Sequence, residues 1–366
     1  MKFIVSRQEL SHLIRKIQNV VPQNAPIPIL SHFLMEAHED EIIFTATDLT
    51  VGIRSSIKVK IYEQGSLSIP SKRFFQLVRE LTEANIEVEA SDKEMVEIKS
   101  GSSRFRLHGM DKEEFPSLPN LKEAVQFALS GSLLKEVFHR TSFAVSKEDS
   151  RYALTGVLMR IEGGRAIFVG ADGKRLARTE IPIPLNSPFS GEYVIPLKAV
   201  DEIMKILVDE EETTVYLTED KIGVEAGNTI LTTKLLASEY PNFDQVIASR
   251  SEMKITLHRE ELVTLLRQVS LFTNDTSQSV RFTFVPGELV LTANSPEVGE
   301  GKVSMPVNYE GERLEIAFNP FYFLDILRHT HDETVTLGVS DPYNPGIITD
   351  STPSLFVIMP MRLYND

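Results

Sequence analysis

The sequence predicts an α+β fold of three repeated domains, each with two helices packed on antiparallel sheets. Three observations predict it. A short apolar strand followed by a helical stripe of apolar residues occurs three times, beginning at Phe3, Phe127 and Ile255. A proline marks the start of a second helical stripe in each copy, at Pro70, Pro196 and Pro320. Between these stripes apolar and polar residues alternate with period two, which is typical of antiparallel strands with one buried face.

The helical stripes follow the i, i+3, i+4, i+7 spacing of one helix face, as in Leu10, Leu13, Ile14 and Ile17. They predict helices over 6–17, 70–82, 131–141, 196–208, 258–270 and 319–331. Asp48 and Asp172 each lie 45 residues after the start of their copy. Shared order over whole copies favours repetition of one unit over three unrelated α+β domains.

The repeat predicts three domains, over residues 1–121, 122–249 and 250–366. Candidate joints are Pro116–Asn120 and Ala248–Glu252. A chain of 366 residues suits two or three domains of ordinary size.

Composition excludes several classes of protein. Apolar residues make up 42% and charged residues 25%, an ordinary globular balance. No run approaches the 18 apolar residues of a membrane span, and the N-terminal segment lacks a signal-peptide apolar region. The absence of cysteine excludes disulfides, thiolate zinc sites and iron–sulfur clusters. We therefore expect a cytoplasmic protein.

The charge is unevenly distributed. The predicted helices carry 13 basic and 8 acidic residues, a net +5, so the remainder of a chain of net charge −14 carries −19. If the helices share one face, that face is positive and suits the phosphates of a nucleic acid. Helix surfaces commonly carry lysine and arginine, however, so this excess is not decisive by itself.

Motifs for catalysis are missing. The sequence has no phosphate-binding glycine loop and no HExxH zinc motif. His329 and His331 are expected at the surface, and the acidic run Asp209–Glu212 is expected to be a solvated loop. These absences predict a protein that is not an enzyme and that needs no metal or cofactor. Two alternatives stay open: a repeat scaffold that binds only proteins, and a DNA-processing enzyme with an unrecognised metal site.

Several motifs together resemble the bacterial sliding clamp family, the beta subunit of DNA polymerase III, over the whole length of the chain. They are Pro28–Leu30, Ala46–Leu49, Ser103–Phe105, Arg151–Tyr152, Ala171–Leu176, Tyr240–Phe243 and Val357–Leu363. The resemblance implies a ring-forming DNA clamp fold: a head-to-tail homodimer that encircles double-stranded DNA without reading its sequence. It also implies that the ring tethers the replicative polymerase, which confers processivity, and that the clamp loader and other proteins with a clamp-binding motif dock on it.

The same resemblance assigns residues to three sites. The partner-peptide pocket comprises Leu154, Gly173, Arg175, Leu176, Pro241, Val246, Asn319, Tyr322, Val357, Met359, Pro360, Met361 and Arg362. The DNA-binding residues are Lys72, Arg79, Tyr152 and Lys198. The dimer interface comprises Arg73, Phe105, Leu107, Leu271 and Phe272.

Two features bear on the pocket. The chain departs from common family residues at Ala171, Lys174, Gln245 and Ser277, so its peptide preference is expected to differ. At the other wall, Pro360 lacks a backbone donor and is expected to end strand pairing. We expect this to free Met359 and Met361 to line the pocket.

Overall fold

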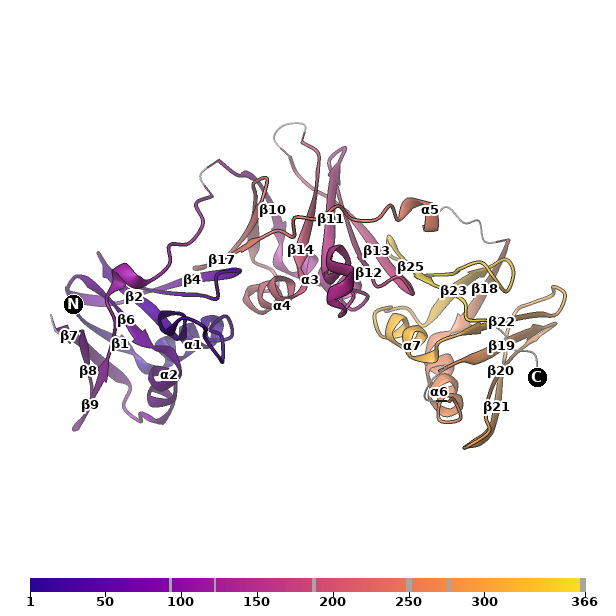
Figure 1. Cartoon of the computed structure of the whole chain (residues 1–366), viewed down its shortest axis with the longest axis horizontal. Helices are drawn as coiled ribbons and strands as arrows, with labels where there is room; N and C mark the ends of the chain where they lie inside the picture. The colour runs from indigo at the N-terminus through magenta and orange to yellow at the C-terminus, as the bar shows by residue number, and fades with distance from the viewer. Residues whose placement is uncertain (92–93, 122, 186–188, 248–251, 275–277, 363–366) are drawn as a thin grey trace. The chain divides into compact units, whose positions relative to one another are not determined.

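The computed structural model describes residues 1–91, 94–121, 123–185, 189–247, 252–274 and 278–362. Within them the chain forms four sheets whose paired strands are all antiparallel (Figure 1). The chain divides into two compact units. The first comprises residues 1–135, 184–186 and 198–235, and the second comprises the remainder.

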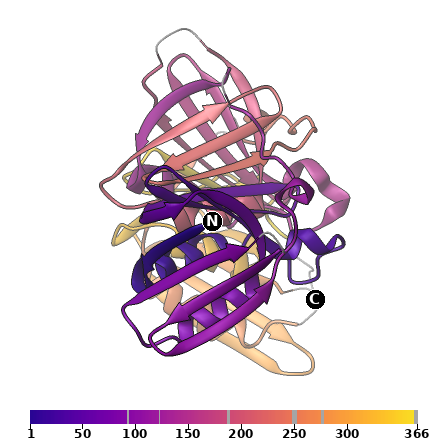
Figure 2. The same ribbon diagram turned by 90° about the vertical axis from the view of Figure 1, so that its left-hand side faces the viewer.

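The first unit contains sheets A and B. In sheet order, the strands of sheet A are β5 (Lys60–Glu63), β1 (Lys2–Ser6), β7 (Asn85–Ser91), β8 (Met95–Ser100) and β9 (Ser103–His108). Those of sheet B are β10 (Val125–Ser130), β15 (Glu212–Leu217), β16 (Lys221–Ala226), β17 (Thr229–Lys234), β4 (Val51–Lys58), β3 (Glu41–Thr47), β2 (His32–His38) and β6 (Gly65–Pro70). Figure 2 shows strands of sheet A in front of the helices of this unit.

The second unit contains sheets C and D. In sheet order, the strands of sheet C are β14 (Gly191–Pro196), β11 (Gly156–Glu162), β12 (Arg165–Ala171), β13 (Arg175–Pro182), β25 (Ser354–Ile358), β24 (Gly346–Thr349), β23 (Thr334–Val339) and β18 (Met253–His258). Those of sheet D are β21 (Gly299–Pro306), β20 (Glu288–Ser295), β19 (Val280–Val285) and β22 (Leu314–Phe318).

All six predicted helices are present, with ends within a few residues of the prediction. They are α1 (Arg7–Ile17), α2 (Ser71–Glu80), α3 (Gly131–Ser142), α4 (Leu197–Ile206), α6 (Arg259–Ser270) and α7 (Pro320–Arg328); the short α5 (Asp244–Ile247) was not predicted. Pro320 is the first residue of α7, as its fixed backbone angle favours. Pro70 and Pro196 instead end β6 and β14, one residue before their helices.

The order of elements repeats three times: strand, helix, several strands, helix, three strands. The copies are nevertheless not separate sheets. β17 of the second copy pairs with β4 of the first, and β25 of the third copy pairs with β13 of the second. Hydrogen-bonded sheets therefore continue across the joints between copies, which is why the compact units do not follow the copies.

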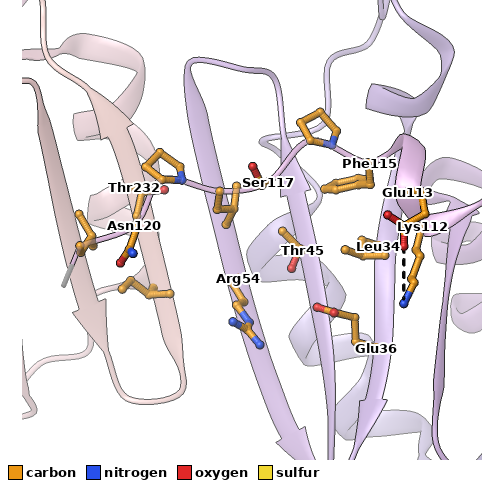
Figure 3. A pocket seen from close by; sticks show the side chains of 15 residues that line it. Leu34, Glu36, Thr45, Arg54, Lys112, Glu113, Phe115, Ser117, Asn120 and Thr232 are labelled. Atoms are coloured by element: carbon orange, nitrogen blue, oxygen red, sulfur yellow. Dashed lines mark ion pairs between the residues drawn. The ribbon is translucent and has the colours of Figure 1, made fainter.

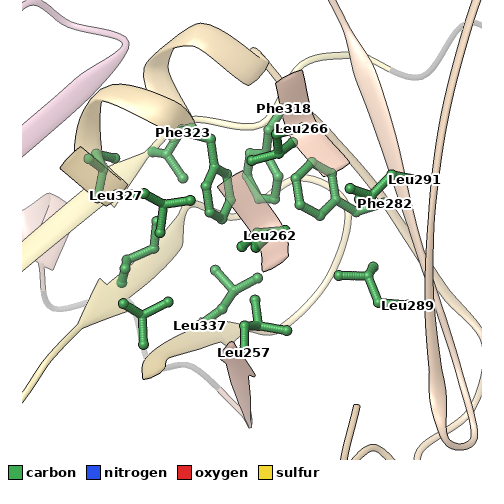
Figure 4. Packing of buried hydrophobic residues seen from close by; sticks show 14 of the residues in the cluster. Leu257, Leu262, Leu266, Phe282, Leu289, Leu291, Phe318, Phe323, Leu327 and Leu337 are labelled. Carbon is green, nitrogen blue, oxygen red and sulfur yellow. The ribbon is translucent and has the colours of Figure 1, made fainter. Parts of the chain in front are cut away.

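The core of the third copy shows how its two helices are held. Phe323 of α7 is fully buried, and its ring centroid lies 5.2 Å from that of Phe282 and 5.7 Å from that of Phe318 (Figure 4). Leu262 and Leu266 of α6 are buried in the same cluster. The apolar stripes found in the sequence thus face the sheets, as amphipathic helices do.

Two side chains depart from the sequence-based expectation. Arg140, counted above among the basic helix residues, is only 2% exposed and bonds to Glu136 and to Asp350, with 2.8 Å between its Nη1 and an Asp350 oxygen. Burial by itself lowers the pKa of Arg140, but its hydrogen bonds to these carboxylates raise the pKa overall, so the buried guanidinium stays charged. Arg140 is therefore a core ion pair and is not available to phosphates.

The expectation that His329 lies at the surface was only partly right, because its side chain is half-buried. α7 ends at Arg328, and the His329 ring stacks on Phe143 at 4.0 Å and against His139 at 4.4 Å. Burial lowers the pKa of His329, because it disfavours the charged ring. His331 is exposed, as expected, and pairs with Glu136.

We predict that Phe323→Ala lowers the free energy of unfolding by about 3–5 kcal/mol, because it leaves a cavity among packed rings. Phe321→Ala is the matched control, since Phe321 lies on the same helix and is 44% exposed. Urea unfolding monitored by circular dichroism measures both. Equal midpoints for the two variants would contradict this description of the core.

Candidate functional site

The β12–β13 turn and the start of β13 carry three residues of the predicted partner-peptide pocket, Gly173, Arg175 and Leu176. Asp172 Oδ1 accepts hydrogen bonds from the backbone N–H groups of Lys174 and Arg175, both at 2.9 Å. Gly173 has φ of +83°, a conformation that favours glycine. Asp48 caps the equivalent turn in the first copy, so the two matched aspartates of the repeat are turn residues.

Arg175 is held in place by groups from three other elements. Its Nη1 donates to Asp325 at 2.7 Å, its Nη2 donates to the Phe143 carbonyl at 3.0 Å, and its Nε donates to Asp172 at 3.2 Å. The guanidinium also lies over the Tyr322 ring, 4.7 Å from its centroid. Because two carboxylates compensate its charge and only 11% of the side chain is exposed, Arg175 acts as an anchor that orients Tyr322.

The C-terminal strand forms the neighbouring wall. β25 pairs with β13 so that Val357 lies opposite Leu176, and the strand ends at Ile358, as predicted. The expectation that Pro360 frees both flanking methionines from pairing was wrong. The Met359 N–H donates to the Lys174 carbonyl at 2.9 Å, and the Met361 N–H donates to the Ala317 carbonyl at 2.8 Å. A proline removes only its own donor, so the segment stays tied to β22 while the Met359 side chain is 39% exposed.

The floor of the site is an apolar cluster on sheet C. Leu176 and Val357 are buried in it with Tyr240 and Phe243, and Leu154 and Val246 are partly buried against it. The Tyr240 hydroxyl lies 3.5 Å from the Val169 carbonyl, and burial raises its pKa, so the phenol stays neutral. The Val357 side chain is only 1% exposed, so its main role in this chain is packing.

Further predicted pocket residues lie around this floor. Asn319 caps α7 by accepting the Phe321 N–H at 2.9 Å, which places Tyr322 beside Arg175. Pro241 and Arg362 are exposed. Of the departures from the family pattern, Ala171 is in the floor cluster, Lys174 lies 6.0 Å from the Tyr322 centroid and Gln245 is exposed; Ser277 lies outside the described residues.

The sequence-based prediction missed Asp325 and Phe143, which hold Arg175. Asp325 carried a weak signal, because it lies three residues from both Tyr322 and Arg328 on one helix face. Phe143 carried none, because it contributes a backbone carbonyl from a distant segment.

The predicted DNA-binding residues differ in their surroundings. Lys72 and Arg79 are exposed on α2, and Tyr152 is 55% exposed in the second unit. Lys198 of α4 is exposed but forms an ion pair with Asp48, which partly compensates its charge. Neither Lys72 nor Arg79 has an ion-pair partner in the described part of the chain, so both are less compensated than Lys198.

The predicted interface residues lie at sheet edges and helix ends. Phe105 and Leu107 are on the edge strand β9, and Arg73 is exposed on α2. Leu271 follows α6 and is 73% exposed. Phe272 packs on the core of its own chain, so close to Gly301 that a Cβ at that position would lie 2.6 Å from the ring.

The described residues contain no group of three His, Cys, Asp or Glu side chains that could hold a metal ion. No helix among them is long and apolar enough to cross a membrane.

Comparison with known proteins identifies the family. Models of the N-terminal, central and C-terminal domains of the DNA polymerase III beta subunit match residues 1–119, 128–242 and 244–362. The beta sliding clamp of Chlamydia pneumoniae is 62% identical over all of both chains. That of Escherichia coli is 30% identical over 99% of this chain and 100% of its own.

A solved structure agrees with these matches. The DNA polymerase III subunit beta of Pseudomonas aeruginosa superposes with a TM-score of 0.96 at 27% identity, over 99% of this chain and 100% of that one. The chain therefore belongs to the DNA polymerase III beta subunit family, the beta sliding clamps, which are non-catalytic processivity factors of DNA replication.

Proposed function

We propose that two copies of this chain close head to tail into a ring around double-stranded DNA, and that partner proteins dock on the cleft around Tyr322 and Leu176. The observation that carries the ring is the pairing rule of the sheets. At both internal joints the last strand of one copy pairs with a strand of the copy before it. That partner is the fourth strand of its copy in chain order: β17 pairs with β4, and β25 pairs with β13.

This rule leaves one last strand and one fourth strand without such a partner. β9 is the last strand of the first copy and lies at the edge of sheet A, and β21 is the fourth-position strand of the third copy and lies at the edge of sheet D. Exposed strand edges carry unpaired N–H and C=O groups that bind further strands. Pairing of β9 with β21 of a second chain repeats the internal joint, and two such joints close a dimer.

The internal joint also supplies the register. In the β17–β4 pair Leu231 lies opposite Ile53, and the matching residues of the edge strands are Phe105 and Gly301. Phe105 is 38% exposed and would lie across from a glycine that Phe272 already covers. The predicted interface residues Phe105 and Phe272 thereby meet at the centre of the joint, where aromatic side chains contribute most to binding.

The same register has electrostatic consequences. It sets Arg106 opposite Glu300 and Arg104 opposite Lys302. Opposite charges across a strand pair stabilise it and like charges destabilise it by similar amounts. Because one pair attracts and the other repels, the net attraction must come from the apolar centre and the backbone pairing.

Encirclement explains processivity without base recognition. Positive side chains on the helices, of which Lys72 and Arg79 are exposed, attract phosphates in a way that weakens steeply as salt rises. Retention by a closed ring does not weaken in that way, because escape requires a joint to open. A polymerase bound to the ring then stays near the primer end at high effective concentration.

The apolar site around Leu176 and Tyr322 supports docking of short apolar peptides. Its floor is apolar, Met359 is partly exposed beside it, and thioethers adapt to several ligands. We assign to it the catalytic subunit of DNA polymerase III, the clamp loader and other proteins with a clamp-binding motif. The domain limits and the cytoplasmic location expected from the sequence stay predictions.

Retention on DNA should depend on DNA topology. Protein loaded on nicked circular DNA is expected to remain bound in high salt and to leave soon after the circle is cut. Gel filtration of labelled protein on circular and linearised DNA measures this. Equal loss from both forms would rule out encirclement.

The joint is tested by Phe105→Ala with Leu271→Ala, two partly exposed positions whose change should leave the fold intact. Truncation of central apolar side chains can cost about 2 kcal/mol or more each, so we expect a monomer at nanomolar concentration. Tyr343→Ala, 87% exposed and outside the proposed joint, is the control. Mass photometry distinguishes the masses, and an unchanged dimer would overturn the assignment.

Deletion of residues 359–366 should abolish peptide docking and leave a folded dimer, because β25 ends at Ile358. Each anchored Leu or Phe of a peptide is expected to gain about 1.5–3 kcal/mol from burial. Fluorescence anisotropy with a labelled Gln-Leu-x-Leu-Phe peptide measures the loss. Deletion of residues 364–366 alone, which lie outside the described residues, is the control and should retain binding. Full binding by the longer deletion would place docking elsewhere.

A further inference from the structure

A second pocket lies in the first unit, on sheet B, where the second copy joins the first (Figure 3). It has a volume of about 500 Å³. Its base is formed by Leu34, Thr45, Arg54 and Ile230, one residue from each of the adjacent strands β2, β3, β4 and β17. Residues 112–113 and 115–121, in the segment that joins the two copies, form its other wall.

The joining segment is fixed at its apolar side chains. Phe115 is buried with Ile29 and Leu30. Leu118 packs on Gly52, where an added Cβ would lie 2.4 Å from the Cδ2 atom of Leu118. Leu121 packs on Gly223 in the same way, with 2.3 Å between an added Cβ and the Cδ1 atom of Leu121. Both glycines are needed for this close approach, and the pocket is therefore formed before any ligand arrives.

The pocket corresponds by register to the base of the partner cleft in the second unit. The matching row across β11, β12, β13 and β25 is Leu158, Val169, Arg178 and Leu355. Val169 of that row is replaced by Thr45 in the first unit, which changes an apolar position into a hydroxyl. The two junctions are thus variants of one arrangement with different chemistry.

The arginines of the two rows differ in their partners. Arg178 donates to Glu180 at 2.6 Å, and the residue that matches Glu180 beside Arg54 is Ser56. Arg54 is exposed and has no carboxylate within 4.0 Å in the described part of the chain. Its charge is therefore available to a ligand.

Thr45 lies directly opposite Arg54 in the strand pair and is only 5% exposed. Its hydroxyl makes no hydrogen bond within the described residues, and Thr45 lines the pocket, so the hydroxyl is free to bond to a ligand there. A carboxylate could accept from both Thr45 and Arg54, which satisfies the hydroxyl and neutralises the cation. Glu36 lines the same pocket, so the ligand should place a neutral or basic group beside its carboxylate.

The joining segment favours a peptide over a small anion. Residues 116–119 lie outside helices and strands, and the N–H groups of Ser117 and Leu118 donate to no described residue. An extended peptide can bind such a backbone by strand-like hydrogen bonds. We infer that this pocket is a second docking site, for an extended peptide that carries an Asp or Glu side chain, and that Arg54 with Thr45 selects that carboxylate.

The test uses the full-length dimer and a fluorescein-labelled Gly-Leu-Asp-Leu-Lys peptide, measured by fluorescence anisotropy. We expect saturable binding that weakens at least tenfold when the peptide carries Asn in place of Asp, and at least tenfold in Arg54→Gln. Thr45→Val, which restores the residue of the second unit, should weaken binding severalfold. Arg178→Gln is the matched control and should bind as the unchanged protein does.

The Gln-Leu-x-Leu-Phe peptide separates this inference from the proposed partner cleft. Added unlabelled, it should not displace the Asp peptide, and labelled, it should bind Arg54→Gln normally. Displacement, equal binding of the Asp and Asn peptides, equal loss in Arg178→Gln, or no binding at millimolar peptide would each overturn the inference.

Discussion

Backbone hydrogen bonding between neighbouring copies determines how the sheets of this chain are built. The last strand of the second copy pairs with the first copy, and that of the third copy pairs with the second, in the pairs β17–β4 and β25–β13. The first and third copies each keep one such strand, β9 and β21, at a sheet edge, and these are the edges that the proposed dimer pairs.

The two proposed docking surfaces both lie at these joints. At each joint the segment that joins two copies crosses the sheet. Large apolar side chains pack this segment onto the sheet: Phe115 and Leu118 at the first joint, Tyr240 and Phe243 at the second. At the first joint a pocket lies between the packed segment and sheet B. The two junctions differ in chemistry at matching positions, Val169 in one and Thr45 in the other, without any change of fold.

Charge serves different purposes in different parts of the chain. Arg140 and Arg175 are held by carboxylates and by neighbouring rings or carbonyls, and their cations stabilise packing between distant segments. For Asp350, burial raises the pKa, but hydrogen bonds from Thr352 and Arg140 lower it overall, so the pair stays ionised at neutral pH. Exposed cations such as Lys72 contribute little to stability and remain available to phosphates.

Features that depend on local contacts could be predicted from the sequence. The three copies, the six helices and the Asp48 and Asp172 turns follow from residue spacing and turn chemistry over a few positions, and the end-to-end motifs established the family. Which strands pair across copies became evident from the tertiary structure, because the residues of a strand do not specify which other strand it pairs with. The tertiary structure also decided that Arg140 is buried, because its partner Asp350 lies 210 residues away, and that Met361 is tied to Ala317. These outcomes depend on contacts between segments far apart in the chain, which the periodicity of a single segment cannot express.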